Sequence, residues 1–275
     1  MDNRTLTIQE AYAKRPRLWW LYTLLVLIVA ALFAWSAMGV EFRGISEKGS
    51  DVARSILLGI IKPDTSLLFT LDKTGVPFLI LETMAIAFLG TIMGALLAIP
   101  FSFLAAETVV PKSVAFVVRG IILLIRTIPS VVWALVLIRV TGPGAFCGVM
   151  TQAIASIGML SKMFINAIED IDTKILESLD AAGCTTFQKV RYGIFPQLTA
   201  NFISTTIYRF DINIKDATTL GIVGAGGIGA PLLQAIGTSR WNMVGAYLLG
   251  LVLMMLLIEY FSTRIRGKLA RGEKG

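Results

Sequence analysis

The chain has 275 residues, of which 55% are hydrophobic and only 16% are charged, and its formal net charge is +7. This balance excludes an ordinary soluble domain and predicts a protein whose solvent is largely lipid. The apolar runs do not alternate as barrel strands would, so we expect an all-α integral membrane protein. The basic residues border apolar runs instead of forming a stripe with interleaved aromatic side chains, so we expect no nucleic acid partner.

The N-terminus carries basic residues ahead of an apolar run at 18–40, namely Arg4, Lys14, Arg15 and Arg17. This run is longer than the roughly 7–15 apolar residues of a signal peptide. It therefore predicts a retained first transmembrane helix with the N-terminus in the cytoplasm, and a cleaved signal peptide is the alternative. The mixed segment 41–75 predicts an external loop with a short amphipathic or surface helix.

Further apolar runs follow in the rest of the chain, at 76–104, 114–138, 143–165, 196–223 and 243–263. Together with 18–40 they predict six transmembrane helices in contact with membrane lipid. The sequence thus divides into an N-terminal part at 1–75, a transmembrane core at 76–263 and a basic tail at 264–275. An even number of spans places both termini in the cytoplasm, where the positive-inside rule favours basic tails.

A polar stretch at 166–196 lies in the cytoplasm by this topology. Ile175, Leu179 and Ala182 share one face of a predicted short helix that Gly183 ends. Thr185 and Gln188 have the spacing of a capping box for a second helix, and Pro196 suits the first turn of the next transmembrane helix. This shape suits docking to a cytoplasmic partner, and a purely structural amphipathic loop is the alternative.

The same stretch resembles the EAA loop of ABC importer permeases, which engages the ATPase. Glu177, Gly183 and Pro196 occupy the Glu, Gly and final Pro positions with the family's spacing. The departures are Ser178 and Leu179 for the two alanines, Gly193 in the Ile position and Phe195 in the Leu position. The resemblance implies ATPase-coupling residues, for which the candidates are Glu177, Ala181, Ala182, Gly183, Phe187 and Pro196.

Four shorter strings resemble the phosphonate-importer permease branch of that family: RTIP at 126–129, VWAL at 132–135, IGML at 157–160 and DATTLGIVGAGGIG at 216–229. The last string is the most specific, and phosphite or hypophosphite importers of the same branch share it. The resemblance implies a type I ABC importer permease of MetI-like architecture. It also implies that the chain conducts phosphonates or related phosphorus oxyanions.

The partners implied by this resemblance are a second copy of the chain, two copies of a separate ABC ATPase and an external phosphonate-binding protein. The sequence contains no Gly-x4-Gly-Lys-Ser/Thr phosphate loop. We therefore expect no enzyme activity and no cofactor in this chain, with ATP and Mg²⁺ bound by the ATPase. Cys147 and Cys184 have no metal-site spacing and the chain has no histidine, so we expect structural thiols and no metal.

The glycine-rich string at 224–229 also satisfies the G-x-G-x-x-G pattern of dinucleotide-binding folds. No Asp or Glu occurs from 217 to 258, so the acid that binds the ribose is missing. We expect instead a flexible close-packed gate or a nest of backbone N–H groups that an oxyanion could approach. The glycines concerned are Gly221, Gly224, Gly226, Gly227 and Gly229.

Ionisable residues within predicted spans are costly and therefore candidates for function. In the run 196–223, Arg209, Asn213 and Asp216 share one helical face, and Asp211 and Lys215 share the opposite one. Neither face suits lipid, so we expect a central helix. Arg126 is expected to be a buried cation near the middle of the helix at 114–138, beside Pro129, which favours a kink in that helix.

The candidate substrate path thus comprises five charged residues: Arg126, Arg209, Asp211, Lys215 and Asp216. For Arg126 the competing role is a structural salt bridge to Glu82, Asp211 or Asp216. An ion-coupled secondary transporter would explain the buried charges equally well but has no reason to carry the loop at 177–196. A permease for a different small solute such as methionine also fits the general pattern. A membrane enzyme acting on phosphorus compounds fits least, because the chain has no histidine.

Overall fold

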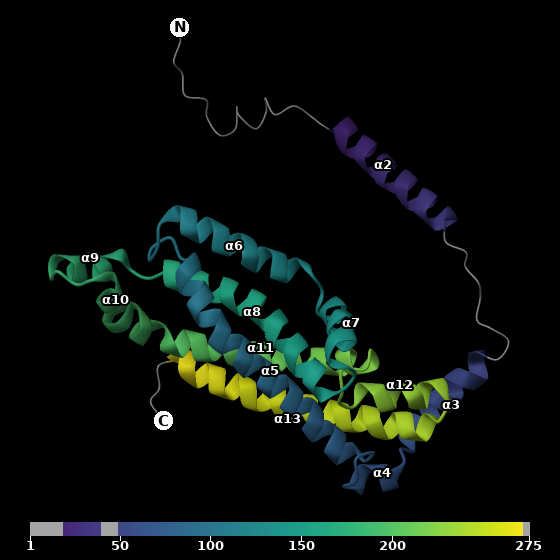
Figure 1. Cartoon of the computed structure of the whole chain (residues 1–275). Helices are drawn as coiled ribbons and strands as arrows, with labels where there is room; N and C mark the ends of the chain where they lie inside the picture. Colours follow the sequence, from purple (N-terminus) through teal and green to yellow (C-terminus); the bar gives the residue numbers. More distant parts are fainter. Residues whose placement is uncertain (1–18, 40–48, 272–275) are drawn as a thin grey trace. The chain divides into compact units, whose positions relative to one another are not determined.

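The computed structural model describes residues 19–39 and 49–271, and the regular elements within them are all helical (Figure 1). The chain divides into two units, Met1–Val52 and Ala53–Gly275. In the first unit, α2 (Trp19–Met38) is apolar on all sides and long enough to cross a membrane, as predicted. The basic residues expected to fix the orientation of the N-terminus lie outside the described residues.

Four long helices form the body of the second unit: α5 (Val76–Ala105), α8 (Ala145–Glu169), α11 (Phe195–Ile222) and α13 (Trp241–Arg271). The most extensive helix packing is between α5 and α8, and Figure 1 shows how the long helices are arranged. A Cβ added to Gly90 would lie 2.3 Å from the Cβ of Gln152, and one added to Gly94 would lie 2.4 Å from the Cβ of Ser156. Small residues four apart let the two backbones meet, as is common between membrane helices.

The expected helix at 114–138 is broken, which corrects the sequence prediction. It consists of α6 (Lys112–Thr127) and α7 (Ser130–Thr141), whose axes differ by 87°. Pro129 has no N–H to continue the helix, and it forces Ile128 out of the α region, to φ −88° and ψ 120°. The proline was predicted to favour a kink, but the structure shows a complete break.

The number of membrane spans follows from length and composition. In the part of the chain that the structure describes, α2, α5, α8 and α13 are long and apolar enough to cross, and α6 with α7 makes a fifth span if the bent pair counts as one. α11 has 28 residues, which gives it a length of roughly 42 Å, but its charged residues exclude it by composition. The predicted total of six therefore depends on α11.

Shorter helices lie at the end of the bundle where α13 begins (Figure 1): α3 (Gly49–Ile61), α4 (Thr65–Phe69) and α12 (Gly229–Gly237). The first two fulfil the expectation of a surface helix in the external segment, whereas α12 was not predicted. Asp64 caps α4 by accepting hydrogen bonds from the Ser66 amide at 3.0 Å and from its hydroxyl at 2.6 Å. The hydroxyl bond lowers the pKa of Asp64 below its usual value.

Candidate functional site

The polar loop between α8 and α11 has the predicted helix-turn-helix form. It contains α9 (Thr173–Ala181), α10 (Thr186–Gln188) and a π-helical turn, η1 (Lys189–Ile194), which runs directly into α11. Gly183 adopts φ +74°, and the amides of Gly183 and Cys184 donate to the carbonyls of Asp180 and Leu179 at 2.9 and 3.0 Å. This is a Schellman motif, so the prediction that Gly183 ends the first helix is confirmed.

The second half of the loop also follows the sequence prediction. Thr185 and Gln188 form the capping box, in which the Thr185 amide donates to Gln188 Oε1 at 2.8 Å and the Gln188 amide donates to Thr185 Oγ1 at 3.4 Å. Pro196 lies in the first turn of α11, where its missing N–H costs nothing. The loop is thus a formed element with its helix ends satisfied.

One surface of this loop is exposed and partly apolar. Phe187 and Tyr192 are 74% and 70% exposed, and the neighbouring candidates Glu177, Ala181 and Ala182 are exposed as well. Phe187 therefore lacks apolar cover within the described chain. An ion pair of 2.7 Å between Lys189 and Asp180 joins the two halves of the loop.

Packing explains why this loop has glycine at residue 193, where the family's loop has isoleucine. A Cβ at Gly193 would lie 2.5 Å from Leu179 Cδ1, so a larger residue in this position would displace the leucine. Leu179 itself stands where the family has alanine. The two departures therefore compensate each other, because the larger side chain on α9 fills the space that the glycine on η1 leaves.

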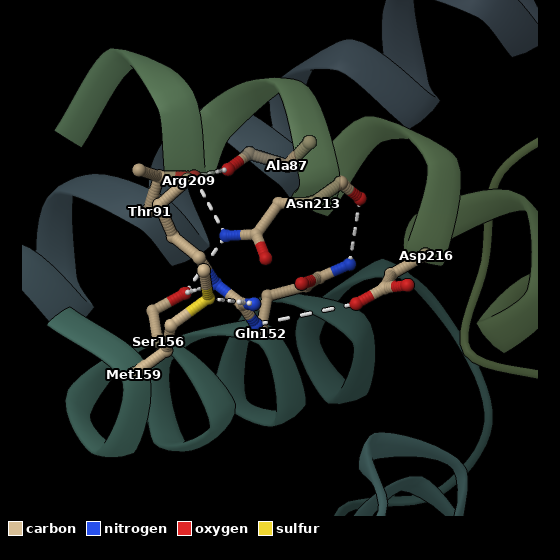
Figure 2. Close-up of polar contacts among 8 residues, drawn as sticks. All are labelled: Ala87, Thr91, Gln152, Ser156, Met159, Arg209, Asn213 and Asp216. Carbon is tan, nitrogen blue, oxygen red and sulfur yellow. Dashed lines mark hydrogen bonds and ion pairs between the residues drawn. The ribbon is translucent and has the colours of Figure 1, made fainter. Parts of the chain in front are cut away.

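Figure 2 shows a buried polar network that joins α11 to α5 and α8. Arg209 is 6% exposed, and its Nε donates to Ser156 Oγ at 3.1 Å. Asn213 is fully buried, and its Nδ2 donates to Ser156 Oγ at 2.8 Å and to Thr91 Oγ1 at 2.7 Å. Asp216 Oδ2 lies 4.0 Å from the Arg209 guanidinium. The predicted shared face of Arg209, Asn213 and Asp216 is confirmed, and it faces the bundle.

Sequence reasoning missed the other members of this network, which are Thr91, Gln152, Ser156 and Met159. Gln152 Nε2 donates to the Asn213 carbonyl at 2.9 Å, and the Arg209 guanidinium lies 3.0 Å from Met159 Sδ. The available signal was the presence of uncharged polar residues inside two apolar runs. Such residues need partners in a membrane, and the charged helix was the obvious source of them.

The opposite face of α11 carries a second group of charges. Lys215 Nζ lies 3.6 Å from Asp211 Oδ2, the predicted i,i+4 pair, and 4.0 Å from Glu259 Oε2 of α13, which was not predicted. The Lys215 side chain is 49% exposed, in contrast to Arg209 on the other face. Lys215 is therefore an accessible cation held between two carboxylates.

A row of polar side chains extends this face along α11. Its further members recur at helical spacing and are at least partly exposed: Gln197, Asn201, Ser204, Tyr208 and Thr219. A cavity of about 320 Å³ lies beside the first of them, between α11 and Leu269 of α13. A polar row along a membrane helix cannot face lipid without unsatisfied groups. It therefore faces water or another protein surface, as expected for a central helix.

Arg126 does not lie where the sequence predicted. Its side chain is exposed, because the break after Thr127 places it in the last turn of α6 instead of in mid-helix. Within residues 49–271 it has no ion pair, so the suggested salt bridges to Glu82, Asp211 and Asp216 are not formed. The aliphatic part of Arg126 instead packs on Gly158 of α8, where an added Cβ would lie 2.6 Å from Arg126 Cγ.

The glycine-rich segment between α11 and α12 is tightly packed. Gly224, Gly226 and Gly227 have positive φ values of 97°, 83° and 74°. Side chains at the last two would meet Ala145 N and Thr83 Oγ1 at 2.7 Å. Thr83 Oγ1 in turn accepts a hydrogen bond from the Ile228 amide at 3.0 Å. Glycine is thus required by both backbone conformation and space.

The outer glycines of this segment approach each other as closely. A Cβ on Gly221 would lie 2.9 Å from the Cα of Gly229. The preceding element is a helix and not the strand that a dinucleotide-binding fold requires, so the G-x-G-x-x-G match has no structural support in the described chain. Within the described ranges, no cluster of three or more His, Cys, Asp or Glu residues could hold a metal ion.

The helices that are long and apolar enough to cross a membrane define the class: a multi-pass membrane protein. The chain belongs to the family of binding-protein-dependent transport system inner membrane components, which matches residues 98–274. It is therefore the permease subunit of an ABC importer and a transport component, not an enzyme. Family membership overrules both the ion-coupled secondary transporter and the membrane enzyme.

Several characterised relatives are similar over much of the chain. A putative phosphite transport system permease protein, HtxC of Stutzerimonas stutzeri, is 31% identical over 247 residues, covering 89% of this chain and 85% of that protein. The phosphite transport system permease protein PtxC of the same organism is 32% identical over 68% of each chain. The phosphate-import permease protein PhnE of Mycolicibacterium smegmatis is 34% identical over 76% of this chain and 38% of that protein.

Solved structures share the fold. A chain of the MetNI methionine ABC transporter in an inward-facing conformation aligns with a TM-score of 0.61 and 24% identity, covering 69% of this chain and 94% of that one. A chain of an amino acid ABC transporter aligns with a TM-score of 0.59 and 20% identity, covering 70% and 91%. The predicted MetI-like architecture is confirmed. ABC importer permeases of this family work with ATPase subunits and substrate-binding proteins.

Proposed function

We propose that this chain is the permease of an ATP-driven importer for phosphonates or closely related phosphorus oxyanions. The similarity to the phosphite transport system permease protein PtxC over 68% of the chain, and to the putative phosphite transport system permease protein HtxC over 89% of it, is the observation that carries this assignment. The methionine transporter supports the fold but not the substrate, because its identity is only 24%. The fully polar face of α11 is consistent with a hydrophilic substrate.

We infer an assembly of two copies of this chain, two ABC ATPase subunits and one external binding protein, with both termini in the cytoplasm. ATP and Mg²⁺ bind to the ATPase subunits. The exposed polar face of α11 supports a second copy, because one bundle alone would leave Lys215 and Asn201 open to lipid. The exposed loop at 173–194 would then lie on the cytoplasmic side, where the ATPase is.

In this assembly the loop residues Glu177, Ala181, Ala182, Gly183, Phe187 and Pro196 couple the permease to the ATPase. The exposed Phe187 serves as the anchor that enters a groove on the partner. Gly183 sets the angle between α9 and the following turn through its positive φ. The direct connection of η1 to α11 transmits movement of the loop to the membrane helix.

The five charges of the candidate path have different roles in this proposal. Lys215 lines the path directly, with the largely buried Asp211 as its ion-pair partner, and Arg126 supplies positive charge where α6 ends. Arg209 and Asp216 lie on the opposite face of α11 and hold it against the bundle. The Asp216 side chain is 36% exposed. Because Lys215 is flanked by two carboxylates, it does not form a deep well that would trap an anion. The packed glycine segment closes the external end.

Reconstitution tests this function. With its ATPase and binding protein in liposomes, the chain should support ATP-dependent uptake of phosphite or methylphosphonate, and methionine should not compete. The chain alone should hydrolyse no ATP, and hydrolysis that persists after contaminating ATPases are removed would contradict the assignment.

Substitution of Gly183 tests the coupling loop in the same system. Gly183→Val should assemble but lose uptake, because valine opposes a φ of +74° although nothing lies within 4 Å of the added Cβ. Gly183→Asn is the matched control, since asparagine tolerates the left-handed region. Wild-type uptake and ATPase stimulation in Gly183→Val would mean that the loop does not couple the subunits.

A further inference from the structure

A small pocket between α6 and α8 lies apart from the polar face of α11. Its volume is about 220 Å³, and three cationic side chains line it: Arg119, Arg126 and Lys162. The nearly fully buried Ile122 and Ile165 contribute an apolar wall. The pocket is smaller than the roughly 300–1,000 Å³ of a typical drug-sized site. Its size and charge suit a small anionic group.

The three cations are not equivalent. Arg119 lies 3.3 Å from Glu107 Oε1 and also contacts Glu169 and the Ala105 carbonyl, so its charge is already compensated. Arg126 and Lys162 have no carboxylate within ion-pair distance in the part of the chain that the structure describes. Two uncompensated cations at one cavity attract a dianion more strongly than a single charge does.

The two free cations line the same pocket. Gly158 on α8 leaves room for the stem of Arg126, which would otherwise meet a Cβ at 2.6 Å. Lys162 follows Gly158 by four residues and therefore lies on the same face of α8. Arginine presents a planar pair of donors to an oxyanion, and lysine adds a mobile point charge. The pocket thus contains the donors that phosphate-type groups require.

We propose that Arg126 and Lys162 form a binding site for a phosphate-type oxyanion in this pocket. The position of this site relative to the membrane rests on the proposed function, which places the C-terminal end of α8 in the cytoplasm. Lys162 is seven residues, or about 10 Å, from Glu169 at that end. The same chemistry is offered by a phosphorus oxyanion that leaves the path and by the headgroup of an anionic lipid, whose chain would lie against the exposed Leu123.

Two binding measurements on the purified transporter complex, made without ATP, distinguish these sources. The first is equilibrium binding of radiolabelled phosphite in detergent, and the second is retention of phosphatidylglycerol against phosphatidylcholine, quantified by mass spectrometry. Lys162→Gln should weaken binding in one of the two by about tenfold or more, the range for loss of a charged hydrogen bond. Loss of phosphite binding identifies the free oxyanion, and loss of phosphatidylglycerol retention identifies the headgroup.

Matched variants keep the result interpretable. Lys112→Gln removes an exposed cation at the start of α6 outside the pocket and should leave both measurements unchanged. Lys162→Arg keeps the charge and should restore binding even if Lys162→Gln assembles poorly. Wild-type binding of both ligands by an assembled Lys162→Gln complex would overturn the site. Failure of phosphite uptake with intact phosphatidylglycerol binding would instead overturn the proposed function alone.

Discussion

Each of the two faces of α11 carries a cation and a carboxylate, but the cation is buried on one face and half exposed on the other. On one face the Arg209 side chain is 7% exposed and is bonded to α8, with Asp216 nearby. On the other the Lys215 side chain is 49% exposed and has carboxylates as its ion-pair partners. Ionisable residues within one membrane helix can therefore have different roles. Those that bond to neighbouring helices stabilise the bundle, and those that are exposed are accessible to other molecules.

The buried face gains its order from neutral partners as much as from charge. Asn213 joins Thr91 of α5 to Ser156 of α8, so a single side chain fixes three helices. The exposed face has no such crossing bonds in the described chain, apart from the long contact of Lys215 with Glu259 and the packing of Arg266 over the Tyr208 ring at 5.3 Å. We therefore expect substitutions to lower stability on one face and uptake on the other.

The largest effect on stability should come from Arg209→Gln. Removing one member of a buried ion pair costs about 3–5 kcal/mol, and the partial exposure of Asp216 favours the lower end of that range. Denaturation of the purified complex and the yield of assembled transporter measure the loss. Normal stability with lost uptake would move Arg209 from the supporting face to the path, and would break the contrast between the two faces.

A smaller loss, about 1–3 kcal/mol, is expected for Asn213→Leu, since the amide's two donated bonds disappear while Thr91 and Ser156 remain buried. Gln152→Met is the control within the same network. The amide oxygens of both residues have no hydrogen-bond partner in the described chain, but Gln152 donates one side-chain bond where Asn213 donates two, so replacing Gln152 should cost less. Equal losses in both variants would show that the amide at 213 has no special role in joining the helices.

Lys215→Gln should cost less stability than Arg209→Gln, because the Lys215 side chain is half exposed and its ion pairs are long, although the Asp211 side chain is only 12% exposed. Uptake per assembled complex should nevertheless fall, since the variant leaves Asp211 and Glu259 to repel an anion. The double variant Lys215→Gln with Asp211→Asn should recover part of the loss. Wild-type uptake in the single variant would remove Lys215 from the path and leave it as part of the scaffold.

The smallest effect is expected for Asn201→Ala, which removes an exposed amide from the N-terminal end of α11 on the same face. The amide oxygen accepts a hydrogen bond from Thr205 Oγ1 at 3.2 Å, so the stability loss should lie at the low end of about 0.5–1.5 kcal/mol. A modest decrease in uptake is the expected result, and steady-state uptake at several phosphite concentrations measures it. A stability loss as large as that of Asn213→Leu would mean that this face is buried against another subunit.

Local features of the fold and site were predictable from the sequence. The shared faces of Arg209 with Asp216 and of Asp211 with Lys215 follow from helical periodicity, and the turn at Gly183 follows from residue chemistry. Features that depend on contact between distant segments were not predictable. Glu259 meets Lys215 only because α13 packs on α11.

The structure differs from the sequence prediction at two further places, where local sequence signals favour competing conformations. Pro129 indicated a kink, but periodicity alone could not distinguish a kink from the 87° break that exposes Arg126. The helix α12 was missed because glycines stand at both of its ends and it is only 9 residues long. In both cases the environment supplied by other helices decides the outcome.

The glycine segment has a consequence for how the permease moves. Its backbone bonds to Gly144 at the start of α8 and to Thr83 of α5, and it also joins α11 to α12, with no space for even one added carbon at several of these contacts. Three helix ends and the second turn of α5 are thereby fastened at one point. We therefore expect this corner to travel as a rigid body during alternating access, so that spin labels placed on α5 and α12 keep one separation throughout the cycle.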